Sequence, residues 1–121
     1  MKYKSFRDMP VWQEAMNLAV EIFQLTENLP KCEDYGLTSQ IRRSSGSVHG
    51  NIAEGFGRKT ANDKSHFYII SRGSCYETQS HLIYGDRVKY FDKQITSELL
   101  ERYTNLIHEL NKILKSLMNK S

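Results

Sequence analysis

Ile41-Arg42-Arg43-Ser44-Ser45-Gly46-Ser47-Val48-His49-Gly50-Asn51-Ile52-Ala53-Glu54-Gly55-Phe56-Gly57-Arg58 combines a helical apolar period with many small side chains. Apolar residues recur along it at helical spacing between Ile41 and Ile52. An isolated amphipathic helix carries long solvated side chains on its outer face, whereas Ser47 and Gly50 leave bare backbone there. Another helix can approach such a surface closely. The segment is therefore predicted to be a helix that packs on more than one side.

Length and composition predict one globular domain over residues 1–121. Apolar residues make up 39% of the chain and charged residues 26%, which is ordinary for a folded protein in water. No apolar run approaches the roughly 20 residues of a membrane span, and the polar start has no signal-peptide core. We expect a cytoplasmic protein without membrane contact. Cys32 and Cys75 lack metal-site spacing and are expected to be reduced thiols.

Four helices account for nearly the whole chain and predict an all-α fold. Their expected ranges are about 8–29, 37–55, 61–88 and 93–118. In the first, apolar residues from Val11 to Leu29 follow alternating spacings of four and three, with Asp8 as the expected cap and Pro30 as the stop. Thr60 and Asp63 resemble a capping box at the start of the third. Because the joints are short, neighbouring helices should be antiparallel, giving an up-down-up-down four-helix bundle.

The third helix is apolar on two opposite sides. One side is the expected core face and the other is a row of residues spaced by seven. A helix at the edge of a four-helix bundle has only one covered face, so a second subunit is the natural cover for the row. The alternative is a set of scattered exposed aromatics. The expected core face is Phe67, Ile70, Ser74, Thr78, His81 and Val88, and the expected oligomer interface is Ile69, Tyr76, Ile83 and Tyr90.

Several charged and amide residues are expected to make structural polar contacts. Arg43 and Glu54 share one side of the second helix but are eleven residues apart, about 16 Å along its axis, so they cannot pair with each other. Placed among small residues, long polar side chains need partners on a neighbouring helix or subunit. The alternative is an exposed face with unpaired charges. The residues expected to make these contacts, among helices two and three of the same or adjacent subunits, are Arg43, Asn51, Glu54, Arg72 and Glu77.

The sequence offers no positive case for an enzyme, a cofactor or a metal. The segment Gly55-Phe56-Gly57-Arg58-Lys59-Thr60 echoes a phosphate loop, but it lacks the glycine before the lysine and follows a helix where a strand is required. Glu77 and His81 form an i, i+4 pair, which is more readily a structural hydrogen bond than a pair of metal ligands.

Four blocks of sequence resemble the family of 23S rRNA intervening-sequence proteins. The match extends from Phe6 to beyond Leu82, and its most specific part is Asn-Ile-Ala-Glu-Gly. The chain departs from the family pattern at Ser44, Ser45 and Gly46. It also has His49 where members have proline, a difference that affects a local helix kink and not the fold. The blocks are Phe6-Arg7-Asp8 with Val11-Trp12-Gln13, Tyr35-Gly36-Leu37-Thr38-Ser39-Gln40-Ile41-Arg42-Arg43, Asn51-Ile52-Ala53-Glu54-Gly55-Phe56-Gly57-Arg58, and Arg72-Gly73-Ser74 followed by Glu77.

This resemblance implies an antiparallel bundle that assembles into a ring, typically a homopentamer, with no enzymatic activity. Some members are encoded within 23S rRNA genes. A related branch accompanies the reverse transcriptases of diversity-generating retroelements, where a basic ring is associated with nucleic-acid binding. A reverse transcriptase or another protein is therefore a partner that the resemblance implies.

Two functional interpretations remain open. In the first, the protein is an oligomeric accessory protein that contacts RNA or DNA phosphates through Arg42, Arg58, Lys59 and Lys64, consistent with the mild net charge of +3. In the second, it is a structural or protein-binding oligomer whose basic residues are solvated or paired. Repetition around a ring would make even a small basic patch multivalent.

Overall fold

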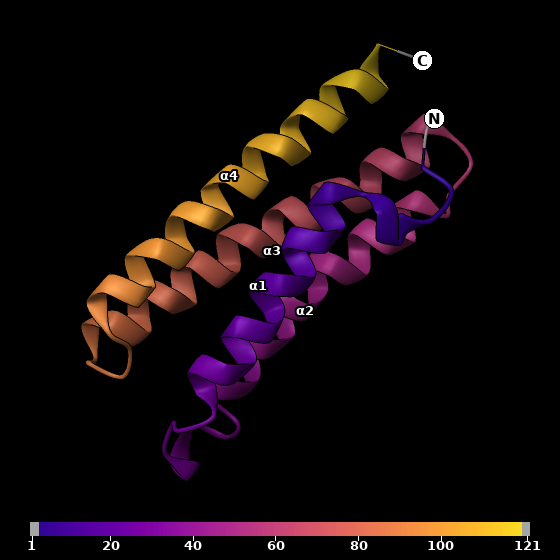
Figure 1. Ribbon diagram of the computed structural model, residues 1–121. Helices are drawn as coiled ribbons and strands as arrows, with labels where there is room; N and C mark the ends of the chain where they lie inside the picture. Colours follow the sequence, from indigo (N-terminus) through magenta and orange to yellow (C-terminus); the bar gives the residue numbers. More distant parts are fainter. Residues whose placement is uncertain (1–2, 120–121) are drawn as a thin grey trace.

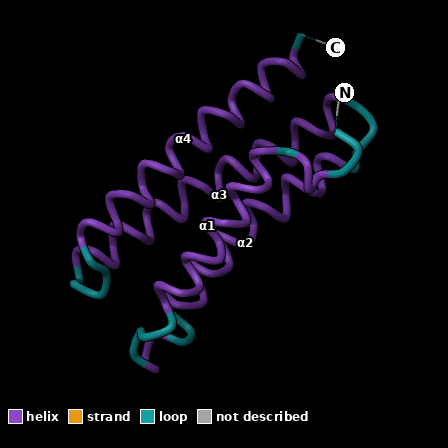
Figure 2. The backbone as a smooth tube through the Cα atoms, viewed as in Figure 1, coloured by secondary structure: helices purple, strands orange, loops and turns teal. Residues whose placement is uncertain are grey.

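The computed structural model describes residues 3–119 and consists of four long helices and two short 3-10 turns, so the predicted all-α four-helix bundle is confirmed (Figure 1). No strand is present in this described part, as the tube view also shows (Figure 2). No helix among these residues is long and apolar enough to cross a membrane. The elements are η1 (Phe6–Asp8), α1 (Pro10–Thr26), η2 (Lys31–Glu33), α2 (Leu37–Phe56), α3 (Ala61–Arg87) and α4 (Lys93–Met118).

Successive helices run in opposite directions. Along the contact between α2 and α3, Ser44 meets Thr78 and Val48 meets Ser71, so the residue numbers rise on one helix as they fall on the other. Figure 1 shows the same alternation for all four helices, and both ends of the chain lie at the end where α2 is joined to α3. Helix α2 continues without a break past His49.

Helix α1 is shorter than the expected range. Asp8 does not cap it, because its carboxylate accepts the backbone N–H of Ser5 and closes a capping box around η1. Met9 is the cap residue and makes no side-chain bond. The helix ends at Thr26, before Leu29, and the Thr26 hydroxyl donates to a carbonyl of the last turn.

The contact between α2 and α3 is lined with hydroxyl groups. Ser44 and Thr78 share a hydrogen bond of 2.8 Å in the core, and the Ser71 hydroxyl donates to the Val48 carbonyl at 2.8 Å. Because these side chains are small and each hydroxyl has a partner, they can be buried without the cost of an unsatisfied polar group. The small residues thus bring the two helices close together, as expected for this segment.

The core face of α3 differs from the expected one. Ser74 and Thr78 are buried as expected, but Ile70 and Val88 are exposed. Ile70 is directed outward because its neighbour Ser71 occupies the hydroxyl-lined contact with α2, and Val88 lies past the last residue of α3. Phe67 and His81, also expected in the core, are only partly buried, and the buried set is Tyr68, Ser71, Ser74, Cys75, Thr78, Leu82 and Gly85.

Helix α3 ends in a Schellman motif. The N–H of Tyr90 donates to the Gly85 carbonyl at 2.8 Å, and the N–H of Lys89 donates to the Asp86 carbonyl at 3.0 Å. Lys89 occupies the left-handed position with φ of 71°, where glycine is favoured. The buried ring of Phe91 packs directly on Gly85, leaving no room for a Cβ.

We predict that Lys89→Gly raises the free energy of unfolding by about 1 kcal/mol, because it removes the steric cost of a Cβ in the left-handed region. Urea denaturation at fixed protein concentration measures the change. Lys89→Ala is the matched control: it removes the charge but keeps the Cβ, and should not stabilise. Equal stabilisation by both variants would contradict the explanation.

Candidate assembly surface and basic residues

Three large side chains form an exposed apolar row on α3. Ile69, Tyr76 and Ile83 are 48%, 56% and 41% exposed. Their spacing of seven places them on one side of the helix, away from the face that packs in the core. Tyr84 and Ile70, which the sequence analysis did not assign to this surface, are also exposed on α3 at 53% and 38%.

Tyr90 does not belong to this row. It lies beyond the end of α3, where the left-handed residue breaks the helical period. Its hydroxyl donates to the Glu33 carboxylate at 2.9 Å, and the same carboxylate accepts the N–H of Leu37 at 3.0 Å. The bond from the Leu37 N–H, followed by that from Tyr90, lowers the pKa of Glu33, while the bond to Glu33 raises the pKa of Tyr90 to about 12. Tyr90 therefore ties two joints of the bundle together.

Glycines expose backbone on the outer side of α2 and α3. A Cβ added at Gly46, Gly50 or Gly73 would meet no atom within 4 Å. Gly46 and Gly50 are four residues apart and lie on one side of α2. These positions leave room for a neighbouring molecule to approach the backbone closely. Ser47, in contrast, accepts a bond of 2.9 Å from the Ser74 hydroxyl and faces α3.

Arg43 and Glu77 form an ion pair between α2 and α3. Their side chains are 54% and 37% exposed, so the pair lies at the surface of this chain and not in a buried contact. His81 lies 3.3 Å from the same carboxylate. Exposed ion pairs contribute about 0 to 1 kcal/mol, so this one orients the helices more than it stabilises them.

The other expected polar contacts have different partners. Asn51 bonds to Ser47 within α2, and Glu54 pairs at 2.7 Å with Arg58 at the end of the same helix. Arg72 donates at 2.9 Å to Asn111 on α4 and makes no bond to α2. Within this chain, these three residues therefore do not bridge α2 and α3, and contacts of the same residues between adjacent subunits stay a prediction.

Two of the residues expected to contact phosphate, Arg42 and Lys64, instead bond to groups at the C-terminal ends of neighbouring helices. The Arg42 guanidinium donates to the Thr26 hydroxyl at 2.8 Å and to the Phe23 carbonyl at 3.3 Å, and lies 4.1 Å from the Phe23 ring. The Lys64 ammonium donates to the Phe56 carbonyl at 2.8 Å. Cations at these carbonyls satisfy the acceptors that a helix end leaves open.

Arg58 and Lys59 are more accessible. Arg58 pairs with Glu54 and lies 4.7 Å from the ring of Phe67. Lys59 is exposed and has no hydrogen bond or ion pair to any residue between 3 and 119. Both residues lie in the joint between α2 and α3. Of the four residues expected to contact phosphate, these two are therefore the accessible ones that lie together.

The charges are distributed unevenly along the bundle. Basic side chains predominate at the end that holds the α2–α3 joint and both chain ends, and acidic ones at the opposite end. The basic end carries Lys4, Arg7, Arg58, Lys59, Lys64, Lys112 and Lys115 against Asp8, Glu54, Asp63 and Glu109. The opposite end carries Glu27, Glu33, Asp34, Asp86, Asp92 and Glu98 against Lys31, Arg42, Arg87, Lys89 and Lys93.

Metal ligands do not converge in residues 3–119, where no three His, Cys, Asp or Glu side chains form a group that could hold an ion. Burial raises the pKa of the Cys75 thiol to about 12, so this cysteine is protonated and unreactive. Burial also lowers the pKa of His49.

Comparisons with known proteins agree with this geometry. The family model described as "23S rRNA-intervening sequence protein" matches residues 7–112. A crystal structure of a protein of unknown function from the S23 ribosomal protein family of Bacteroides thetaiotaomicron is similar, with a TM-score of 0.78 and 22% identity, covering 87% of this chain and 98% of that one. No curated protein matches the chain.

We predict that Arg42→Met lowers the free energy of unfolding by about 1 to 2 kcal/mol, because it removes hydrogen bonds to the end of α1 and a contact with an aromatic ring. The matched control, Lys59→Met, should change stability by about 0.5 kcal/mol or less. Thermal and urea unfolding measure both. Equal effects would show that Arg42 has no special structural role.

Proposed function

Because the chain belongs to the 23S rRNA-intervening sequence protein family, we propose that it is a non-enzymatic protein that works as a homo-oligomer assembled through the outer face of α3. The exposed row of Ile69, Tyr76 and Ile83 carries this proposal. The family resemblance favours a pentamer. The non-enzymatic role is supported by the polar residues of α2 and α3, which bond to neighbouring side chains and helix ends.

The free energy gained by burying the row alone is too small to drive association, which indicates that the interface is larger than the row. Full burial of one such side chain contributes about 1.5 to 3 kcal/mol, and these three are already about half-buried. Association costs about 4 to 15 kcal/mol, so further contacts are required. Additional surface on α2 and α3 comes from the exposed side chains of Ile70 and Tyr84 and from the open glycines.

We predict that Tyr76→Glu dissociates the oligomer, because it places an unpaired charge where apolar surface would be buried. Light scattering at micromolar concentration should give a mass several times 14.1 kDa for the natural protein and a lower mass for the variant. Circular dichroism should show that the variant remains helical.

Tyr35→Glu is the matched control for the change in charge. Tyr35 is 97% exposed in the joint before α2 and is not part of α3, so its variant should keep the oligomer intact. A natural protein that is monomeric at micromolar concentration would contradict the proposal. So would dissociation of both variants to the same extent.

The second candidate function is weak binding of RNA or DNA by the basic end of the assembly. The observation that favours it is the accessible pair Arg58 and Lys59 among an excess of basic residues. The Arg58–Glu54 pair is exposed and therefore weak, so a phosphate could replace the carboxylate. In a ring whose axis runs along the bundles, every subunit would present this end on the same side, giving a multivalent surface.

We predict that nucleic-acid affinity falls steeply as salt rises and that Arg58→Ala with Lys59→Ala flattens the slope, because fewer counterions are released. Fluorescence anisotropy with RNA and DNA at two salt concentrations measures this. The matched control, Lys89→Ala with Lys93→Ala, removes two charges from the acidic end and should leave the slope unchanged. Absence of binding by the intact oligomer at about 50 mM salt would favour an oligomer with a structural or protein-binding role.

A further inference from the structure

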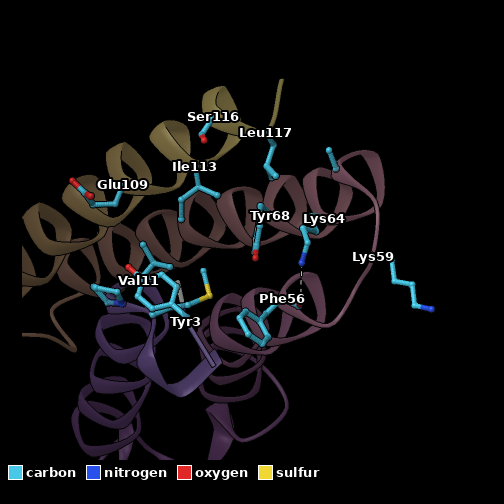
Figure 3. A pocket seen from close by; sticks show the side chains of 13 residues that line it. Tyr3, Val11, Phe56, Lys59, Lys64, Tyr68, Glu109, Ile113, Ser116 and Leu117 are labelled. Atoms are coloured by element: carbon cyan, nitrogen blue, oxygen red, sulfur yellow. Dashed lines mark hydrogen bonds between the residues drawn. The ribbon is translucent and has the colours of Figure 1, made fainter. Parts of the chain in front are cut away.

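A cavity of about 540 Å³ lies at the basic end of the bundle, between the start of α1 and the last turns of α4 (Figure 3). Its origin is a difference in helix length. Pro10, the first residue of α1, lies beside Glu109 of α4, and α4 continues from there to Met118. No helical residue of α1 is therefore available to cover the end of α4.

The walls of the cavity are mainly apolar. Val11 of α1, Phe56 at the end of α2, and Ile113 and Leu117 of α4 face it. The volume is within the range of about 300 to 1,000 Å³ that is typical of small-molecule sites. Because an apolar cavity of about 150 Å³ can hold benzene, this one is large enough for a chain of several carbons.

The hydroxyl of a buried tyrosine opens into the cavity. Tyr68 is only 3% exposed, it lines the cavity, and it has no hydrogen bond to any residue from 3 to 119. Its ring packs on Gly55, where an added Cβ would lie 2.7 Å from the ring, so the glycine fixes the position of the tyrosine. Burial raises the pKa of Tyr68 to about 12, so the hydroxyl remains a donor at neutral pH. A donor without a protein partner in an apolar cavity favours a ligand that supplies an acceptor.

The Lys64 ammonium lies on the same side of α3, one turn before Tyr68. Two of its donors are directed at the carbonyls of Phe56 and Gly55, at 2.8 and 3.4 Å, and an ammonium has three donors in all. Figure 3 shows the Lys64 nitrogen and the Tyr68 hydroxyl oxygen both directed toward the end of α2, whereas Lys59 points away. The one carboxylate on the wall, Glu109, pairs with Lys112 at 3.0 Å.

We propose that this cavity binds a small amphipathic carboxylate, with its apolar body between α1 and α4 and its carboxylate at the Tyr68 hydroxyl and the Lys64 ammonium. The apolar walls account for the body of the ligand, and the unpartnered donor beside a cation accounts for the head group. The excess of basic residues at this end of the bundle also favours an anion. This site goes beyond the proposed function and does not depend on it.

Titration with octanoate by isothermal calorimetry and by ¹H–¹⁵N spectra tests the proposal. We expect saturable binding, with shifts at Ala61, Lys64 and Leu117, and weaker binding of octan-1-ol, which lacks the charge. Tyr68→Phe keeps the ring on Gly55 and should weaken octanoate binding about tenfold or more through loss of one hydrogen bond to a charged group.

Tyr84→Phe is the matched control, because Tyr84 is exposed on α3 and does not line the cavity. It should leave octanoate binding unchanged. Lys64→Met provides a second test and should also weaken binding in protein shown to be folded by circular dichroism. No saturable binding, equal affinity for octan-1-ol, an unaffected Tyr68→Phe variant, or shifts confined to Ile69, Tyr76 and Ile83 would each overturn the proposal. Because light scattering measures assembly separately, failure of this site is distinguishable from failure of the oligomer.

Discussion

Serine and threonine hydroxyls at the contact between α2 and α3 determine how α3 is oriented in the bundle. The bond between Ser44 and Thr78 and the bond from Ser71 to the Val48 carbonyl are satisfied only when the small side of α3 faces α2. Buried hydroxyls without partners would cost about 1 to 3 kcal/mol each, which outweighs the gain from burying a half-exposed apolar side chain. Ile69, Tyr76 and Ile83 are therefore directed outward, where a second molecule can cover them.

Cations at the ends of helices explain why few basic residues are available for a ligand. Arg42 bonds to the last turn of α1, and Lys64 bonds to the last turn of α2. Helix ends carry partial negative charge and open carbonyls, so they attract the nearest guanidinium or ammonium on a neighbouring helix. At the end of α2 the carbonyls of Gly55 and Phe56 already accept from Lys64, and Lys59 in the adjoining joint has no hydrogen bond or ion pair to any residue between 3 and 119.

The sequence predicted the number, order and approximate limits of the helices because the apolar period is a local property of the chain. It placed Ser74 and Thr78 on the core face of α3 but missed Ser71, because the Val48 carbonyl that accepts from the Ser71 hydroxyl lies on another helix. In the sequence, the seven-residue spacing of the row extends to Tyr90, but the helix ends before Tyr90 because Lys89 is left-handed. The partners of Arg42 and Arg72 lie on other helices, at distances along the chain that no spacing rule reveals. Tyr68 was missed because its burial and its place in the cavity depend on how α1, α2 and α4 pack around it, which spacing along α3 does not reveal.

The assembly surface and the cavity lie on different sides of the bundle and can coexist. Residues Ile69 and Tyr76 project from the outer side of α3, whereas Tyr68, one position before Ile69, projects into the core. Successive residues of a helix differ by about 100° in direction, so adjacent positions can serve an interface and an interior site. Helices α2 and α3 contribute Phe56, Lys64 and Tyr68 to the cavity, but none of the row residues Ile69, Tyr76 and Ile83 lines it, so a subunit packed on the row would leave the cavity open. Each subunit of a ring would then retain its own cavity at the basic end, so a bound anion would lie beside the same residues that are proposed to contact phosphate.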